Sequence, residues 1–201
     1  MVSSPAMYDR AVIGSLTSRD GEAFDIVFGL DKVLVEQLVK YSLNTSDVEL
    51  QKHTSDHQRF GNGSYEEWFG KGRTPYALVS AGNELAALAW FGPKPIGRKS
   101  LRYLSEAELK EEYSQPTGDA HTVVYRSYGQ FRGKGLMTRF MQFAIQDYKA
   151  RYPEAKLWAG VSSHNEASVA LANKLGFIYS EEYSDPENNW AAMFENDIWR
   201  A

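Results

Sequence analysis

The sequence predicts an α+β protein in which a mixed sheet is flanked by helices. Three observations lead to this prediction: a β-hairpin precedes the middle of the chain, strands and helices alternate after it, and one helix pattern is long and amphipathic. The 201 residues can bury a core, and 43% hydrophobic with 24% charged residues is typical of globular proteins. We expect a flexible lead-in over 1–20 and a single domain over 21–201.

The first fifty residues after the lead-in predict a strand followed by helices. FDIVFGL over 24–30 is rich in strand-forming residues, and Asp31 can cap a helix whose apolar residues follow at helical spacing. Two further helices are predicted by capping-box pairs, which are Ser46 with Glu49 and Ser64 with Glu67.

The middle of the chain predicts a hairpin and then a long insertion. Tyr76–Ser80 and Glu84–Phe91 flank a turn that contains Gly82 and Asn83, a pattern typical of β-hairpins. Residues 92–120 form a long loop insertion with a short helix candidate, and such a loop either covers a site or lies on the surface without a role.

The remaining chain alternates strands and helices. Apolar residues between 136 and 148 recur at the spacing of one helical face, which predicts a long amphipathic helix. The other predicted elements are strands over 121–128, 156–161, 177–183 and 190–199 and a short helix over 165–175 that ends at Gly176.

The turn between the strand at 121–128 and the long helix has the features of an anion site. The first amides of a helix have no intrahelical acceptor, and the helix dipole adds positive potential at the same end. Gly133 and Gly135 let a phosphate approach the backbone, while Arg132 and Lys134 add charge. The pattern predicts a bound phosphate or diphosphate, although glycines that serve turn geometry alone remain an alternative.

Two other phosphate-binding loops do not fit this turn. A P-loop needs four residues between its first glycine and Gly-Lys, whereas only three separate Gly129 from Gly133. The dinucleotide fingerprint G-x-G-x-x-G fails because Thr138 stands where the third glycine belongs.

Two segments resemble the GNAT superfamily of N-acyltransferases. Gln130-Phe131-Arg132-Gly133-Lys134-Gly135 is similar to the family signature Q/R-x-x-G-x-G/A, and the stretch from Asn165 to Phe177 is similar to N-x-x-S/A…K-L-G-F. The resemblance extends over about 121–183 and implies a mostly antiparallel sheet. Its strands at 121–128 and 156–161 would splay apart to form the acyl-CoA cleft.

The resemblance also implies which residues bind coenzyme A. The turn would hold the diphosphate, the end of the preceding strand would contact the pantetheine arm, and Asn165 would contact the arm from the other side. The expected contacts are Ser127, Tyr128, Gln130, Phe131, Arg132, Gly133, Lys134, Gly135, Leu136, Asn165 and Ser168.

The catalytic groups are less clearly marked. Many family members have a tyrosine that protonates the leaving thiolate, but Ala172 stands at that position, so Ser168 is the candidate substitute. Strand alternation puts His121 and Tyr125 on one face, and a histidine suits a general base at neutral pH. A water chain remains possible, and so do the other candidate bases, which are Glu84, Glu181 and Glu182.

Composition argues against several classes of protein and of binding site. The net charge is −4, which argues against nucleic-acid binding, and there is no cysteine for a disulfide, thiolate or zinc–thiolate site. His53 and His57 have helical ligand spacing without a completing ligand, so we expect no metal. No apolar run approaches membrane-spanning length, so we expect a soluble, cytoplasmic protein.

The sequence therefore predicts an acetyl-CoA-dependent N-acetyltransferase acting on an amine of unknown identity, either a small molecule or a protein N-terminus or lysine. A monomer or a homodimer is expected. The alternative is a non-catalytic acyl-CoA-binding regulatory module on the same fold, an alternative that the alanine at 172 motivates.

Overall fold

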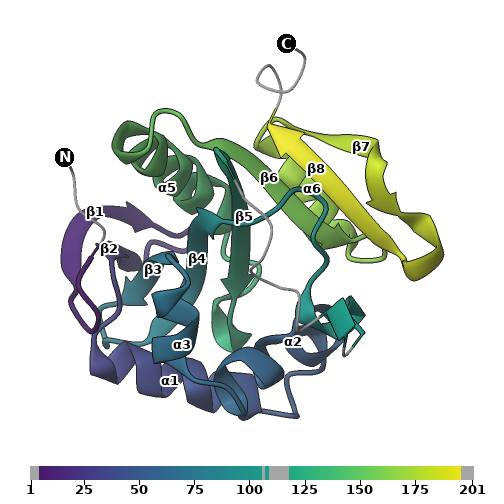
Figure 1. The fold of residues 1–201 in the computed structure, drawn as a ribbon. Coiled ribbons are helices and arrows are strands. Elements are labelled where there is room, and N and C mark those ends of the chain that lie inside the picture. The colour runs from purple at the N-terminus through teal and green to yellow at the C-terminus, as the bar shows by residue number, and fades with distance from the viewer. Residues whose placement is uncertain (1–4, 106, 109–117, 196–201) are drawn as a thin grey trace. The chain divides into compact units, whose positions relative to one another are not determined.

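A computed structural model describes residues 5–105, 107–108 and 118–195 (Figure 1). The chain divides into two compact units, and the single domain expected over 21–201 stays a prediction. Each unit combines two stretches of sequence, which are Met1–Phe91 with Tyr125–Pro153 in the first unit and Gly92–Val124 with Glu154–Ala201 in the second.

The first unit contains an antiparallel sheet. Its strands pair in the order in which they follow along the chain, and they are β1 (Ala11–Thr17), β2 (Ala23–Phe28), β3 (Thr74–Ser80) and β4 (Leu85–Pro93). The residue after β5 (Ala120–Ser127) lies against this sheet, because the Tyr128 N–H donates to the Ala86 carbonyl at 3.0 Å. The predicted hairpin is confirmed, and Asn83 in its turn adopts a φ of 60°.

Residues 11–17 form an edge strand, so the prediction of a loose lead-in over 1–20 is wrong for this segment. β1 pairs with β2 from Ala11 opposite Phe28 to Thr17 opposite Ala23. Leu16 is its one buried residue, so the segment lacks the alternation of apolar and polar residues that marks a half-buried strand.

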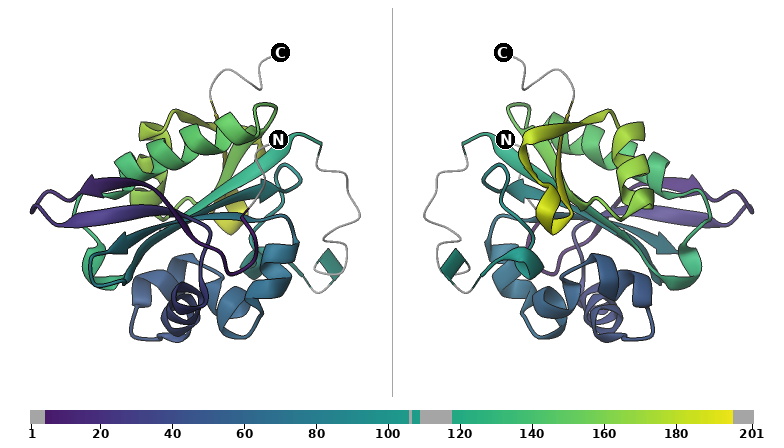
Figure 2. Two further views of the ribbon diagram at one scale, coloured as in Figure 1. Left: turned by 90° about the vertical axis from the view of Figure 1, so that its left-hand side faces the viewer. Right: turned by 90° about the vertical axis from the view of Figure 1, so that its right-hand side faces the viewer.

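Helices cover both faces of this sheet. Figure 2 shows α5 on one face, with α1 and α3 on the other. The helices of the unit are α1 (Lys32–Leu43), α2 (Val48–His53), α3 (Tyr65–Gly70) and α5 (Met137–Arg151), with a π-helical turn over His57–Gly61. Because helices cover both faces, β3 is buried along its whole length and β4 from Leu85 through Gly92, which explains the unbroken apolar run of β4.

The caps agree with the predictions at two helices and differ at the third. The Asp31 side chain accepts from the Leu34 N–H and begins α1, and the Ser64 hydroxyl accepts from the Glu67 N–H and begins α3. For α2 the predicted cap, Ser46, is wrong: Asp47 occupies the cap position and accepts from the Leu50 N–H. The Ser46 hydroxyl instead donates to the Asn44 side chain.

The second unit contains β5, β6, β8 and β7 in that spatial order. The first pair is parallel and the other two pairs are antiparallel. Its elements beyond β5 are β6 (Lys156–Ser162), α6 (Glu166–Lys174), β7 (Phe177–Asp185) and β8 (Trp190–Glu195). With antiparallel pairing in the first unit as well, the predicted α+β fold with a mixed, mostly antiparallel sheet is confirmed.

Two tryptophans form the centre of the second unit. The rings of Trp158 and Trp190 meet edge to face with centroids 6.2 Å apart, and both side chains are buried. Gly160 makes this packing possible, because a Cβ there would lie 2.6 Å from a Trp190 ring carbon. Ile96 and Tyr103 also pack on this core, so part of the predicted 92–120 loop is anchored to it. The rest of that loop, including most of its helix candidate, lies outside the described residues.

Candidate functional site

The predicted anion-binding turn lies in the first unit, between β5 and α5. A short 3₁₀ turn over Gly129–Phe131 follows Tyr128, and Leu136 then precedes the first residue of α5. Gly133 and Gly135 have φ angles of 78° and 75°, which side-chain-bearing residues rarely adopt. The glycines are therefore required by the path of the backbone.

The amides of this turn are free to bind an anion. Among the residues described, none accepts a hydrogen bond from the backbone N–H groups of 133–138, and no side chain caps α5. The first bond of the helix runs from the Phe140 N–H to the Leu136 carbonyl at 3.0 Å. Consecutive unpaired amides at the positive end of a 15-residue helix form a site for an anionic group.

The two signature glycines serve different purposes. A Cβ at Gly133 would meet nothing within 4 Å, so the backbone there faces open space that a phosphate can enter. A Cβ at Gly135 would lie 2.5 Å from the Arg19 Nε, so this glycine allows the Arg19 side chain to pack against the turn. The Arg19 N–H also donates to the Lys134 carbonyl at 3.1 Å, which ties the turn to the β1–β2 connection.

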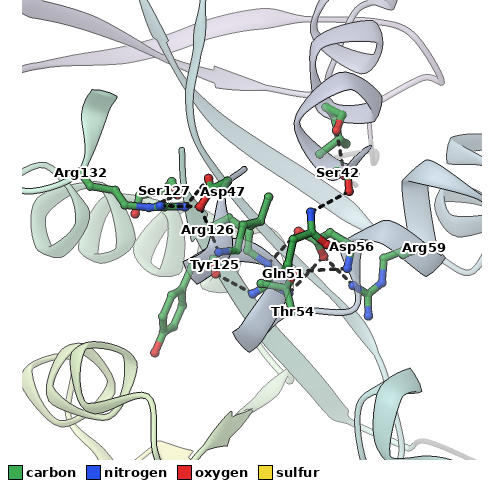
Figure 3. A network of polar contacts seen from close by, with 12 residues as sticks. Ser42, Asp47, Gln51, Thr54, Asp56, Arg59, Tyr125, Arg126, Ser127 and Arg132 are labelled. Atoms are coloured by element: carbon green, nitrogen blue, oxygen red, sulfur yellow. Dashed lines mark hydrogen bonds and ion pairs between the residues drawn. The ribbon is translucent and has the colours of Figure 1, made fainter. Parts of the chain in front are cut away.

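Arg132 holds the turn to the start of α2 (Figure 3). Its two terminal nitrogens donate to the two carboxylate oxygens of Asp47, each at 2.7 Å, and its Nε donates to the Ser127 carbonyl at 3.0 Å. Burial opposes ionisation of Asp47, but hydrogen bonds from Arg132 and from the Leu50 amide hold the pKa of this carboxyl below its usual range. The Nε and both terminal nitrogens of Arg132 therefore already donate to protein groups.

Lys134 is also paired within the protein. Its ammonium contacts the carboxylate of Glu22 and lies 3.6 Å from that of Asp20, and the hydrogen bond to Glu22 raises the pKa of the lysine. The sequence predicted that Arg132 and Lys134 would add charge around a phosphate. In the structure both cations are compensated by carboxylates, so the positive potential of the turn comes from the unpaired backbone amides and from the Arg19 guanidinium that packs beside Gly135.

The other residues of the turn anchor it. Phe131 and Leu136 are buried, and the Phe131 ring meets that of Phe24 edge to face at 5.8 Å. The Gln130 side-chain amide donates to Glu84 at 3.3 Å. Ligand contacts predicted for these residues therefore depend on their backbone, because their side chains already have protein partners.

A second polar network lies beside the end of β5 (Figure 3). The Asp56 carboxylate is fully buried and accepts from the Arg126 Nε at 2.9 Å and from an Arg59 terminal nitrogen at 2.8 Å. Both guanidiniums lie over the Trp90 ring, 5.2 and 5.3 Å from its centroid. Arg126 also donates to the Tyr125 carbonyl at 2.8 Å. Sequence reasoning missed this network, since Asp56 and Arg126 lie 70 positions apart.

The remaining predicted residues are divided between the units. Tyr125 is half-buried and belongs to the first unit, whereas His121, Asn165 and Ser168 belong to the second. The Asn165 side chain caps α6 by accepting from the Ser168 N–H at 3.1 Å. Ala172, which replaces the family tyrosine, is buried with 1% of its surface exposed. The roles assigned to these residues stay predictions.

The pairing of β5 with β6 is short. Three residue pairs join them, from Ala120 opposite Lys156 to Thr122 opposite Trp158. β5 continues to Ser127 and β6 to Ser162, and β6 pairs with β8 along its other edge from Trp158 to Ser162. The splaying of the two strands stays a prediction.

The described residues contain no cluster of three or more histidine and carboxylate side chains that could hold a metal ion. Across the same part of the chain, every helix is too short or too polar to cross a membrane.

A sequence model described as the acetyltransferase (GNAT) family matches residues 41–177, more than half of the chain. This chain belongs to the GNAT family. The matched range includes the predicted anion-binding turn and α6, which are the two segments that carry the signature motifs. This GNAT protein is therefore an acyltransferase. No curated protein sequence matches it.

Solved structures share the GNAT fold at low sequence identity. The GNAT domain of S. lividans PAT has a TM-score of 0.59 and 15% identity, covering 96% of this chain and 98% of that one. The ribosomal-protein-S5-alanine acetyltransferase from Vibrio fischeri has a TM-score of 0.56 and 13% identity, with coverage of 94% and 100%. RimL, a ribosomal L7/L12 α-N-protein acetyltransferase solved with coenzyme A, has a TM-score of 0.57 and 17% identity, with coverage of 92% and 96%.

Proposed function

We propose that this GNAT protein transfers an acetyl group from acetyl-CoA to a primary amine. The observation that carries the proposal is the row of unpaired amides over 133–138, together with the open space beside Gly133. A diphosphate needs several directed donors and close access to the backbone, and this turn offers both. The complex of RimL with coenzyme A supports the choice of ligand.

The chain's own residues would then position the reactants. The turn would hold the diphosphate, and the backbone after Arg126 would contact the pantetheine arm and polarise the thioester carbonyl. Holding the amine beside the thioester supplies much of the rate, because reaction between positioned groups avoids the entropy cost of an encounter. We assign His121 as the base that accepts the amine proton, with Tyr125, four residues further along β5 and on the same face by strand alternation, as an alternative.

Departure of the thiolate needs no dedicated acid. Ala172 lacks the hydroxyl that many relatives use, and a thiol with a pKa of about 8.5 leaves as the anion at a cost of about 2 kcal/mol at pH 7. We propose that Ser168, one helical turn earlier in α6, assists this step. A cytoplasmic location and a monomeric or homodimeric state, both inferred from the sequence, complete the proposal.

The second candidate is a non-catalytic acyl-CoA-binding module, which the buried Ala172 favours. The two candidates differ in turnover. An assay for the free CoA thiol across protein N-terminal peptides, lysine peptides, polyamines, aminoglycosides and amino acids separates them. Tight CoA binding without thiol release for every amine would establish the binding module.

The site itself is tested with a matched pair of glycine variants. Gly133 and Gly176 both have positive φ angles, of 78° and 84°, and a Cβ at either position meets nothing within 4 Å. Gly133→Asp and Gly176→Asp therefore impose similar backbone strain, but only the first places a carboxylate at the predicted diphosphate site. We expect the CoA dissociation constant, measured by calorimetry, to rise at least about tenfold in Gly133→Asp alone. Unchanged affinity in Gly133→Asp would contradict the site.

A further inference from the structure

Among the described side chains, the ion pairs at Asp56 join two guanidiniums to one carboxylate. Arg59 and Arg126 share this carboxylate, and the charges of Arg126 and Arg73 both act on Arg59. Burial lowers the pKa of Arg59, as does repulsion by the other two guanidiniums. A buried cluster of this kind is complementary to an additional anionic group.

The same network has more hydrogen-bond donors than acceptors. Within the described residues, the side-chain hydrogen bonds of Arg59 involve one terminal nitrogen, although a guanidinium carries several N–H donors. The buried Tyr128 hydroxyl has no hydrogen-bond partner among the residues that the structure describes, and its pKa is raised well above the usual value by burial first and then by the Asp56 charge. A buried hydroxyl without an acceptor costs free energy unless a ligand or a rearrangement supplies one.

Part of this network is accessible. The side chains of Arg59 and Arg126 each keep 15% of their surface exposed, whereas Asp56 keeps 1%. Their planar groups are oriented by Asp56 and by the Trp90 ring beneath both of them. Two guanidiniums fixed by a buried carboxylate, with donors left over, form a receptor for a carboxylate, which pairs with guanidinium groups in a planar geometry.

The network is connected to the predicted acyl-CoA site through β5. Arg126 directly precedes Ser127 in this strand, and the backbone of Ser127 is predicted to contact the pantetheine arm near the thioester. Three carboxylates near the turn are not available to a polycationic acceptor, because Asp20 and Glu22 pair with Lys134 and Asp47 pairs with Arg132.

We propose that the acceptor of this enzyme is an amine that also carries a carboxylate, as amino acids and their derivatives do, and that Arg59 and Arg126 bind that carboxylate. This inference rests on the proposed acetyl transfer, since it assigns the substrate class of the same site. It distinguishes carboxylated amines from polyamines and aminoglycosides, whose groups would meet two cations.

The test uses acetylated products as binding probes. N-acetylglycine, N-acetylaspartate and N-acetylphenylalanine, each with its carboxamide counterpart, are titrated into the full chain by calorimetry with and without CoA. We expect at least one carboxylate to bind about tenfold more tightly than its carboxamide. Equal affinity within every pair overturns the inference, as does preferential acetylation of spermidine over every amino acid.

Two matched variants locate the carboxylate. Arg126 and Arg151 both donate through Nε to an aspartate, both lie over an aromatic ring, and their side chains are 15% and 16% exposed. Arg126→Lys is expected to remove the preference for carboxylate over carboxamide, while Arg151→Lys retains it. Equal preference in the two variants would overturn the assignment.

The CoA-binding measurements and the carboxylate titrations test the proposed function and this inference separately. CoA binding and its loss in Gly133→Asp test the acyl-CoA site alone, and the titrations without CoA measure the carboxylate preference in either case. A protein that binds CoA and shows no preference for carboxylates retains the proposed function and refutes the substrate class.

Discussion

Replacing Asp47 by asparagine tests whether the Asp47 carboxylate holds the predicted CoA-binding turn between β5 and α5 in place. Asparagine caps helices about as well as aspartate, so the bond from the Leu50 N–H is retained and the two charge-assisted bonds to Arg132 are weakened. Hydrogen bonds to charged groups contribute about 1.5–3 kcal/mol, and the 34% exposure of the Arg132 side chain reduces this. We expect Asp47→Asn to lower the free energy of unfolding by about 1–2 kcal/mol.

Asp31→Asn is the matched control. Asp31 caps α1 through the Leu34 N–H in the same way, and its ion pair with Arg10 spans 3.2 Å between side chains that are 32% and 28% exposed. Pairs this exposed contribute about 0–1 kcal/mol, so Asp31→Asn should cost less than Asp47→Asn in urea unfolding. It should also leave CoA affinity unchanged, whereas Asp47→Asn weakens it, because Asp31 does not contact the turn.

The pH dependence gives a third measurement on the same variant. The folded-state pKa of Asp47 lies below its unfolded value, so its stabilising contribution is present above about pH 4 and is lost as pH falls through the folded pKa. Asp47→Asn should therefore lose less stability on acidification than the parent protein. Equal stability losses in Asp47→Asn and Asp31→Asn, with unchanged CoA affinity in both, would refute the role given to Asp47.

Two further predictions concern residues of the second unit, Gly160 and Asp185. Gly160→Ala should destabilise the protein by about 1–3 kcal/mol in urea unfolding, because its Cβ would lie 2.6 Å from the Trp190 ring, whereas Gly70→Ala, with open space, should be neutral. A small effect at Gly160 would mean that the tryptophan relaxes. The Lys99 ammonium lowers the pKa of Asp185 to about 2, so Asp185 contributes stability that is lost as pH falls from about 4 through 2. Asp185→Asn should flatten this part of the stability profile, and an unchanged slope would contradict the pairing.

Local sequence patterns predicted those parts of the fold whose causes are local. The caps at Asp31 and Ser64, the hairpin around Asn83 and the glycine turn before α5 each depend on residues within a few positions. The family resemblance implied that β5 and β6 splay apart, but not the register in which they pair. β1 was missed because an edge strand with a single buried residue, Leu16, leaves little pattern to detect.

The partners of the turn could not be predicted from sequence. Arg132 and Asp47 lie 85 positions apart, and Lys134 and Glu22 lie 112 apart, so no local spacing connects them. Each side chain alone is typical of a solvated surface. Only the folded arrangement shows that several of these acids neutralise the cations of the turn.

The pairing of Arg132 and Lys134 with carboxylates of the same protein affects which polyanions the turn selects. Because Arg132 and Lys134 are each paired at close range, these two cations extend little field into solvent and add little long-range attraction for nucleic acids. A compact ligand that reaches the backbone instead gains short, directional bonds, which ionic strength weakens far less than interactions between distant charges. Discrimination at this helix end therefore depends on fit to the main chain, and it persists across the range of salt concentrations that a cell experiences.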